Sequence, residues 1–314
     1  MPTPTAYFEG QFVPLPEAKI GVMTHAFNYG TAVFEGVRGN WNEAHGELYL
    51  FKLREHVRRI RQSAKIMRLG VSLSEDEMVE VIADLAQRNG YREDVYVRPI
   101  VYKSSEQIGL RVHNLDDDFL VYVAPFGAYL DPDAGVRCMT SSWRRIDDTM
   151  IPARAKVTGL YVNNALAKTE AQLSGFDEAI LLNADGHVSE GSGENIVLLR
   201  NGRLISPAAH DNILEGITLD TALAIASVEL GLEVERRTVD RSELYIADEI
   251  FMTGTAAHVT PVTEVDRLPI GDGQPGPVTV ELQRRYFAAI TGELPEYREW
   301  LTPTYASATV GAQS

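Results

Sequence analysis

The chain has one cysteine, Cys138, among 314 residues. It therefore has no internal disulfide framework, and its composition fits a reducing compartment. It also has no apolar run that approaches the ~18 residues a membrane-spanning helix needs. The first residues, MPTPTAYFEG, do not pair a basic region with an apolar one, so we expect no secretory signal. These absences predict a cytoplasmic protein without a membrane partner.

Basic residues are also scarce. The chain has 29 Lys and Arg against 44 Asp and Glu, which gives a net charge of −15. A negative field of this size repels a phosphate backbone, so we expect no nucleic-acid partner. The sequence contains no H-E-x-x-H motif, and no clustered histidine accompanies the acidic run at residues 116–118. This predicts no metal site, and the acidic run reads as a solvated turn.

The length suits two domains better than one. The segment PFGAYLDP, residues 125–132, breaks all periodicity and is rich in proline and glycine. Such segments are typical of linkers. We therefore predict a small N-terminal domain at residues 1–124, an interdomain loop at 125–132 and a larger C-terminal domain at 133–314.

Several elements of the N-terminal half can be predicted from local patterns. Residues 7–13 and 19–22 are expected as short strands. Residues 54–69 form an amphipathic helix, whose polar face is strongly basic and carries Arg54, Arg58, Arg59, Arg61, Lys65 and Arg68. Such a face usually pairs with neighbouring carboxylates, although one arginine could also bind phosphate. The pattern alone does not select which one.

The run VYVRPIVY, residues 95–102, is a strand pattern interrupted by Arg98 and Pro99. Proline predicts an edge strand or a bulge. The arginine needs a partner, and a structural ion pair is the favoured interpretation. The aromatic and glycine-rich stretch at residues 24–39 fits either a packed strand or a pocket wall.

The stretch IPARAKVTGLYVNN, residues 151–164, places Lys156 among small and apolar neighbours. Desolvation lowers the pKa of an ammonium, and a neutral amine can form a Schiff base and move a proton. The alternative is an ordinary surface lysine. Downstream residues favour the first interpretation, because they supply the other parts of a pyridoxal phosphate site.

Two of these parts are a carboxylate and a phosphate cradle. Glu190 heads the glycine-flanked motif SEGSGEN, and a carboxylate there could keep a pyridine nitrogen protonated. A helix predicted over residues 213–231 opens at Gly216, Ile217 and Thr218, where free amides suit a phosphate. The strand end at residues 253–256 offers amides for a second anion. Alternatively, Glu190 is an ordinary glutamate in a surface turn.

The motifs HAFNYGTAVFEGVR, REHVRRI, YVRP, SEGSGEN, EGIT and FMTGTAA, together with the Lys156 stretch, occur in this order along nearly the whole chain. In this order they resemble the branched-chain-amino-acid aminotransferases, which are pyridoxal phosphate enzymes of fold type IV. The resemblance implies an α+β chain of the D-amino-acid aminotransferase-like fold, with a small α/β domain and a larger, β-barrel-like α/β domain. It implies transamination of leucine, isoleucine and valine with 2-oxoglutarate, which yields 2-oxo acids and L-glutamate.

The resemblance also assigns roles. Lys156 matches the catalytic lysine, and the cofactor-binding set matches Arg59, Tyr161, Glu190, Leu214, Ile217, Thr218 and Thr255. The substrate-binding set matches Tyr29, Phe34, Tyr96, Arg98, Ile108, Leu110, Phe126, Tyr129 and Ala256. Because the family's counterparts of Ile108 and Leu110 reach into the other subunit, a homodimer or a larger assembly of dimers is expected.

Two departures from the family pattern bear on substrate range. Leu160 stands where the family often has a polar residue, and Arg111 and His113 occur in an unusual loop. An extra arginine there could favour acidic co-substrates or other amines. Rival activities of the same fold are transamination of D-amino acids or (R)-amines and aminodeoxychorismate lysis, and a rival of another class is an inactive amino-acid sensor.

Overall fold

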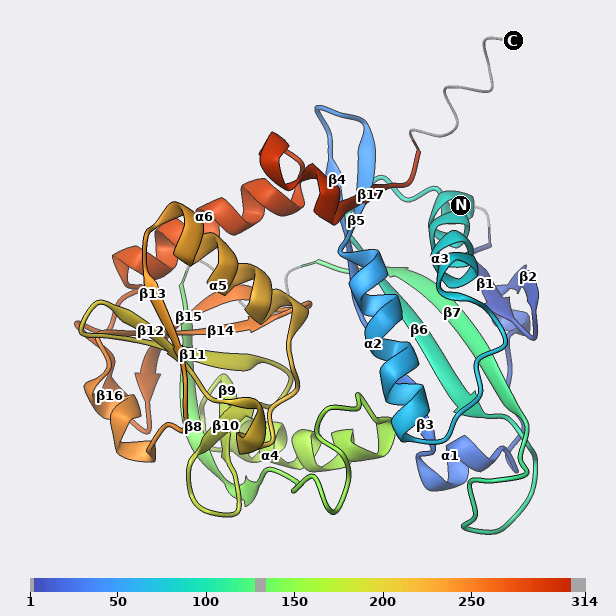
Figure 1. Cartoon of the computed structure of the whole chain (residues 1–314), viewed down its shortest axis with the longest axis horizontal. Coiled ribbons are helices and arrows are strands. Elements are labelled where there is room, and N and C mark those ends of the chain that lie inside the picture. The colour runs from blue at the N-terminus through green and yellow to red at the C-terminus, as the bar shows by residue number, and fades with distance from the viewer. Residues whose placement is uncertain (1–2, 128–133, 306–314) are drawn as a thin grey trace. The chain divides into compact units, whose positions relative to one another are not determined.

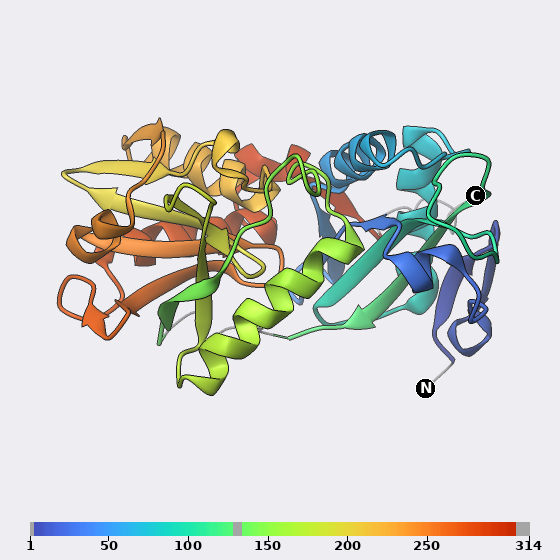
Figure 2. The same ribbon diagram turned by 90° about the horizontal axis from the view of Figure 1, so that it is seen from below.

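The computed structural model describes residues 3–127 and 134–305, and these residues divide into two compact units (Figures 1 and 2). Unit 1 comprises residues 3–127, 155–159 and 288–305, and unit 2 comprises residues 134–154 and 160–287. Both units combine helices with a sheet, so the predicted α+β class is confirmed. The domain boundaries predicted from sequence stay a prediction. The structure adds that the short stretch around Lys156 belongs to unit 1.

Unit 1 is built on an eight-stranded sheet with the order β17-β5-β4-β6-β7-β1-β2, in which β3 also pairs with β6. Its strands are β1 (Thr5–Phe8), β2 (Gln11–Pro14), β3 (Ala32–Phe34), β4 (Val37–Asn42), β5 (Glu47–Phe51), β6 (Val95–Lys103), β7 (Asp117–Pro125) and β17 (Leu301–Pro303). Its helices are α1 (His25–Tyr29), α2 (Leu53–Ile66) and α3 (Glu75–Asn89). Helix α2 packs on β3 and β6, and α3 packs on β1, β6 and β7.

The N-terminal strand predictions are wrong in detail. The expected strand at residues 7–13 is a hairpin of β1 and β2, in which Tyr7 pairs with Phe12. Glu9 and Gly10 both have positive φ, 49° and 75°, as a two-residue hairpin turn requires. The expected strand at residues 19–22 is absent from the described chain, because a turn closed by Thr24 N and Gly21 O (3.0 Å) takes its place.

The prediction of an edge or bulge at Pro99 is also wrong, because β6 is an interior strand. Strands β3 and β4 both pair with β6 in the same register, and the gap between them at Glu35 and Gly36 lies opposite Pro99 and Arg98. Proline has no N–H to donate, so the neighbouring strand is interrupted there. Pro99 O still accepts the amide of Glu35 at 3.0 Å. The proline is tolerated inside the sheet because its partner strand is broken.

Helix ends follow local sequence closely. The Ser-x-x-Glu spacing of Ser74 and Glu77 forms a capping box at α3, where Glu77 N donates to Ser74 Oγ and Ser74 N donates to Glu77 Oε2. The helix ends at Gly90, whose φ of 65° is left-handed. Of the basic face of α2, Arg54 and Arg58 pair with Glu75 at the surface, as expected for a solvated face. Arg59 behaves differently and is described below.

Unit 2 is built on a curled nine-stranded sheet with the order β10-β9-β8-β15-β14-β11-β12-β13, to which β16 adds beside β15 (Figure 1). Its strands are β8 (Val136–Arg144), β9 (Glu178–Leu182), β10 (Val188–Gly191), β11 (Asn195–Arg200), β12 (Arg203–Ser206), β13 (Glu233–Arg236), β14 (Glu249–Gly254), β15 (His258–Val265) and β16 (Leu268–Pro269). Helix α4 (Tyr161–Leu173) packs on β8 and β9, α5 (Ile217–Glu229) packs on β13, β14 and β15, and α6 (Pro277–Ile290) begins in this unit (Figure 2). Apolar side chains from most of these strands form its core.

Short 3-10 helices complete the chain at Leu15–Glu17, Thr158–Leu160, Ala209–Asp211, Arg241–Ile246 and Pro295–Trp300. Across the described ranges, none of the helices is both long enough and apolar enough to cross a membrane. In the same ranges, no group of three or more His, Cys, Asp or Glu side chains is arranged to hold a metal ion.

Candidate active site

Lys156 is half-buried in unit 1, and its segment is held in place by backbone hydrogen bonds. Its amide N donates to Ser63 Oγ on α2 (3.2 Å), and its carbonyl accepts the amide of Phe34 at the end of β3 (3.0 Å). The amine Nζ lies 5.2 Å from the centre of the Phe34 ring. Close by, Thr158 Oγ1 donates to the carbonyls of Gly30 and Ala32. This lysine is therefore anchored to a helix and a strand and is not on a mobile surface loop.

Arg59 is the one member of the basic face of α2 that forms an ion pair with a fully buried carboxylate, Glu35, within the described residues. Arg59 Nε donates to Glu35 Oε1 (2.6 Å) and Nη2 donates to Oε2 (2.8 Å). His56 Nδ1 also lies 2.8 Å from Oε2. Burial opposes ionisation of Glu35, but the charge and hydrogen bonds of Arg59 outweigh it and hold the pKa well below its usual range. The structure thus separates Arg59 from its neighbours, which the helical pattern could not do.

Four of the predicted substrate-binding side chains form one cluster in unit 1. The Arg98 guanidinium lies over the rings of Phe34 (4.3 Å) and Tyr96 (5.0 Å), and its Nη2 donates to Tyr96 Oη (3.1 Å). Phe126, also predicted, lies 5.2 Å from Tyr96 between ring centres. Gly36 leaves room for this cluster, since a Cβ there would lie 1.8 Å from Tyr96 Oη.

The ion pair favoured for Arg98 on sequence grounds is wrong. No carboxylate of residues 3–127 or 134–305 pairs with this arginine, and its buried Nε has no hydrogen-bond partner among them. Strand alternation explains the difference, because Arg98 shares a face with Tyr96 and Phe34, whereas Glu35 lies on the opposite face. A guanidinium stacked on aromatic rings without a carboxylate is suited to bind an acidic ligand.

The remaining predicted residues of unit 1 lie around Gly109. Tyr29 Oη accepts the Gly109 amide (3.2 Å), and His25 Nε2 lies 2.8 Å from the Gly109 carbonyl. The flanking Ile108 and Leu110 are 85% and 83% exposed. Tyr129 lies outside the described residues.

Glu190 is buried in unit 2, at a β-bulge of β10. Three donors converge on its carboxylate. Arg145 Nη2 lies 2.6 Å from Oε1, and Oε2 accepts Asn195 Nδ2 (3.0 Å) and the amide of Leu214 (2.8 Å). The interpretation of Glu190 as a surface turn residue is therefore wrong, because this carboxylate is buried and is bound by one arginine and two further hydrogen-bond donors.

Arg145 and Asn195 were not among the residues predicted from sequence. The buried Arg145 also donates to Asn212 O (3.0 Å) and to Asn164 Oδ1 (3.0 Å). Together with Glu190, these give its guanidinium three partners. Asn195 donates to Leu214 O (2.8 Å). No local pattern in the sequence marks Arg145, because its partner Glu190 is 45 positions away.

The predicted phosphate cradle lies at the start of α5. The helix begins at Ile217, four residues later than the predicted start, because the backbone amide and carbonyl of Leu214 bond to the side chains of Glu190 and Asn195. Gly216 is required here, since a Cβ would lie 1.9 Å from Asn195 Oδ1. First-turn amides have no carbonyl partner within their own helix. Thr218 adds a buried hydroxyl, and Ile217 and Leu214 are half-buried.

Thr255 and Ala256 lie in the turn that joins β14 to β15, and both are half-buried. The preceding Thr253 pairs with Asn195 across β14 and β11. Its Oγ1 is buried without a hydrogen-bond partner among the described residues. Tyr161 opens α4. Unit 2 therefore holds Tyr161, Glu190, Leu214, Ile217, Thr218, Thr255 and Ala256, and Asn195 links Glu190, Leu214 and Thr253.

A second acidic centre in unit 2 includes Glu194 of the SEGSGEN motif. Glu194 and Glu178 are buried and hydrogen-bonded to each other, and Lys168 Nζ lies 2.5 Å from Glu178 Oε2. Burial and the charge of Glu178 raise the pKa of Glu194 to about 8, although Lys168 and the Gly193 amide act in the opposite direction. Glu194 is therefore protonated near neutral pH.

This carboxyl should make stability depend on pH. An unfolded glutamate has a pKa of about 4.3, so between that value and about 8 the folded protein binds about one more proton here. The contribution of Glu194 to the free energy of unfolding is complete below a pH of about 4.3, the unfolded pKa. It is lost as the pH rises toward 8. Glu194→Gln mimics the protonated form, so the melting temperature of this variant should fall less than that of the wild type from pH 5 to 8. Glu233→Gln, at the surface, should follow the wild type; equal slopes for all three proteins would contradict this prediction.

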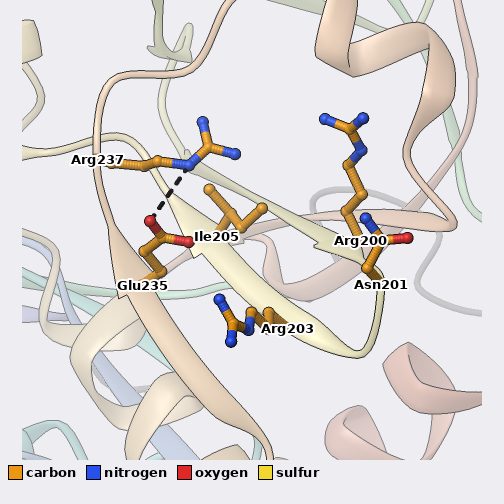
Figure 3. A pocket seen from close by; sticks show the side chains of 6 residues that line it. All are labelled: Arg200, Asn201, Arg203, Ile205, Glu235 and Arg237. Carbon is orange, nitrogen blue, oxygen red and sulfur yellow. Dashed lines mark ion pairs between the residues drawn. The ribbon is translucent and has the colours of Figure 1, made fainter.

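One cavity of about 370 Å³ lies elsewhere in unit 2 (Figure 3). Its lining residues are Arg200, Asn201, Arg203, Ile205, Glu235 and Arg237. Glu243 pairs with Arg200 and Arg237, and Glu233 pairs with Arg203, so carboxylates balance the arginines. The cavity is lined by none of the predicted site residues.

The chain is similar to known proteins in both sequence and fold. The sequence matches the amino-transferase class IV family over residues 32–265. A probable branched-chain-amino-acid aminotransferase of Aquifex aeolicus is 49% identical over 300 residues, which cover 96% of each chain. A branched-chain aminotransferase structure from Thermoproteus uzoniensis, solved with norvaline, has a TM-score of 0.92 at 42% identity and covers 96% of this chain and 99% of that chain. The branched-chain amino acid aminotransferase of Thermobaculum terrenum, solved in its PLP form, has a TM-score of 0.92 at 38% identity and covers 97% of this chain and 99% of that chain.

Proposed function

This chain belongs to the amino-transferase class IV family, and we propose that it transfers the amino group of leucine, isoleucine or valine to 2-oxoglutarate. The similarity to branched-chain aminotransferases over 96% of the chain carries the choice of substrate. The fold type IV architecture agrees with that of the solved relatives.

The cofactor we propose is pyridoxal 5'-phosphate, and the residues fit it. Glu190 presents an anion backed by Arg145, which suits a protonated pyridine nitrogen. The start of α5 offers amides and the Thr218 hydroxyl to a phosphate. Thr253 contributes a buried hydroxyl that has no partner among the described residues. When bound, the cofactor supplies an aldehyde that condenses with amines and a ring that withdraws electrons.

In this proposal the residues of the chain have distinct tasks. Arg59, Ile217, Thr218 and Thr255 would hold the phosphate, Tyr161 would donate to the phenolic oxygen, and Leu214 would contact the ring. Glu190 would stabilise a positive charge on the ring nitrogen. Lys156 Nζ, as a neutral amine, accepts the proton that leaves the substrate α-carbon and later gives it up. The amides of Thr255 and Ala256 receive the substrate carboxylate.

The substrate side chain would meet Phe34, Tyr96, Phe126, Tyr29 and Tyr129. Apolar and aromatic walls suit branched-chain side chains. Glutamate uses the same pocket, so its second carboxylate needs a cation, and Arg98 is that cation in this proposal. The support is its position over two aromatic rings without a carboxylate partner among the described residues.

Replacing Arg98 with methionine should therefore separate the two half-reactions. We expect kcat/KM for glutamate to fall by about tenfold or more, because a charge-assisted contact is lost, and kcat/KM for leucine to change little. Arg111→Ala is the matched comparison, because Arg111 is the exposed arginine that could also bind an acidic co-substrate. A glutamate-specific loss in Arg111→Ala and not in Arg98→Met would contradict this assignment.

We also propose a homodimer whose loop residues Ile108 and Leu110 enter the partner's pocket, and a cytoplasmic location. The support is the exposed apolar pair itself, which flanks Gly109. Tyr29 and His25 hydrogen-bond to the backbone of Gly109 and so fix the loop. Large apolar side chains rarely stay exposed together without a binding role. Val22 and Phe27, 80% and 68% exposed, flank Thr24, whose backbone pairs with Glu106 just before this loop.

Charges at these positions should dissociate the dimer. Sedimentation of the double variant Ile108→Glu/Leu110→Glu should give a monomer with reduced activity. Val228→Glu on α5, which replaces an equally exposed apolar residue, should stay dimeric. A double variant that remains a fully active dimer would remove this proposal.

The substrate assignment is tested with a panel of amino donors and 2-oxoglutarate as acceptor. Leucine, isoleucine and valine should be the preferred donors. Preference for D-alanine or (R)-1-phenylethylamine, or release of pyruvate from aminodeoxychorismate without an acceptor, would overturn it.

A further inference from the structure

Glu35 is fully buried in unit 1 and binds Arg59 with both carboxylate oxygens. A two-point contact fixes the plane and rotation of a guanidinium, which a single contact does not. Arg59 is only 12% exposed, whereas Arg54 and Arg58 on the same helix are 46% and 56% exposed. Exposed pairs of the latter kind contribute little. The buried pair therefore needs a separate explanation.

The local structure fixes Glu35 as firmly as it fixes Arg59. Glu35 lies in the gap between β3 and β4, where its amide donates to the carbonyl of Pro99. His56, one turn before Arg59 on α2, contacts the same carboxylate oxygen as Arg59 Nη2. Burial lowers the pKa of His56 although Glu35 raises it, so the ring is neutral. Glu35 is thus held by the sheet and by the helix that also carries Arg59.

The charges of this group cancel. Glu35 contributes one negative charge, Arg59 one positive charge, and the neutral His56 none. A buried ion pair is weak evidence of stability, because desolvation offsets the attraction. Arg59 would then act on a phosphate through the direction of its N–H groups more than through net charge. A guanidinium has five N–H donors, and Glu35 accepts two of them.

The same helix also anchors the lysine segment. Ser63, one turn after Arg59, accepts the backbone amide of Lys156. Phe34, the residue before Glu35, donates its amide to the Lys156 carbonyl. The carboxylate that holds Arg59 is therefore next in sequence to a residue that holds Lys156.

We propose that Glu35 is a positioning residue that sets the Arg59 guanidinium for the phosphate of the cofactor, with His56 holding the Glu35 carboxylate in place. This inference rests on the phosphate role proposed above for Arg59. It assigns a task to a carboxylate that would contact neither cofactor nor substrate.

The test compares a ligand that has the phosphate with one that lacks it. The apoprotein is titrated with pyridoxal 5'-phosphate and with pyridoxal. The Kd for pyridoxal divided by the Kd for pyridoxal 5'-phosphate measures how strongly the protein prefers the ligand with the phosphate. Glu35→Asp keeps the charge but shortens the side chain, and Glu35→Gln keeps the length but removes the charge. If Glu35 positions Arg59, both variants should lower the ratio by about tenfold, with the Kd for pyridoxal unchanged.

A purely electrostatic role gives a different result. Glu35→Asp would then match the wild type, and Glu35→Gln would bind pyridoxal 5'-phosphate more tightly, because a negative charge near the phosphate is gone. Either result overturns the proposal. A general loss of structure would weaken both ligands and leave the ratio unchanged, which also counts against it. Should Glu35→Gln fail to fold, Glu35→Asp and His56→Gln carry the test, and a normal ratio in both rejects the proposal.

Arg59→Gln separates this inference from the proposed function. If Arg59→Gln leaves the ratio unchanged, the phosphate role of Arg59 is wrong and the inference fails with it. If Arg59→Gln lowers the ratio and the Glu35 variants do not, only the inference fails. The double variant Glu35→Gln/Arg59→Gln should show the same ratio as Arg59→Gln alone, because Glu35 acts through Arg59. Arg58→Gln, which breaks a surface pair on the same helix, should match the wild type.

Discussion

Replacing Lys156 with alanine should reduce kcat for leucine by at least about 10⁴-fold, because one substitution removes both the amine nucleophile and the proton carrier. The fold should survive the change. The segment is held by backbone groups of Lys156, which alanine retains, and those groups bond to Ser63 and Phe34. The measurement is a single-turnover assay with leucine, combined with a melting curve that establishes an intact structure.

The matched control is Lys65→Ala, which removes an exposed lysine from α2. It should retain wild-type activity. Added methylamine should restore part of the activity of Lys156→Ala, since a small amine can replace the missing proton carrier. Substantial turnover by Lys156→Ala without added amine would rule out this mechanism.

The second large effect is expected at Glu190. Glu190→Gln should lower kcat by about 10²–10³-fold, the usual cost of removing one electrostatic stabiliser from an active site. The amide also puts an N–H₂ group where two donors now converge, those of Asn195 and Leu214, or else against Arg145. At least one donor then loses its acceptor, and where the amide nitrogen faces Asn195 and Leu214 the loop that leads into α5 should also loosen.

The measurement is kcat for leucine together with the pH dependence of the absorbance of the holoenzyme. The absorbance should change in Glu190→Gln, because the ring nitrogen is no longer kept protonated. Glu215→Gln, a neighbouring exposed position, should leave both quantities unchanged. Normal turnover by Glu190→Gln would show that this carboxylate does not serve the cofactor ring.

The helix ends that the sequence predicted are those decided by nearby residues. The capping box of Ser74 and Glu77 and the left-handed Gly90 act within a few positions, so their pattern is visible in the chain. The same is true of the end of α4, which is followed by Gly175 with φ 80°. Local rules failed where a distant partner decided the result. Pro99 is interior to the sheet because the strand opposite it is interrupted.

Family motifs mark single candidate residues of the site, but they do not show the partners that determine the role of each residue. Glu35 and Arg59 are 24 positions apart, and Arg145 and Glu190 are 45 apart, so neither pair forms a pattern in sequence. The sequence suggested an ion pair for Arg98, whereas the structure pairs the neighbouring Glu35 with Arg59 on the other face of the sheet. Strand alternation and packing against α2 determine which arginine pairs with a carboxylate. The composition of the chain does not reveal this.

Borohydride reduction of the holoenzyme, followed by peptide mapping with mass spectrometry, shows which side chain carries the cofactor. We expect one phosphopyridoxyl group per chain, on the Nζ of Lys156. A label on another side chain, or no label, would contradict the role proposed for Lys156.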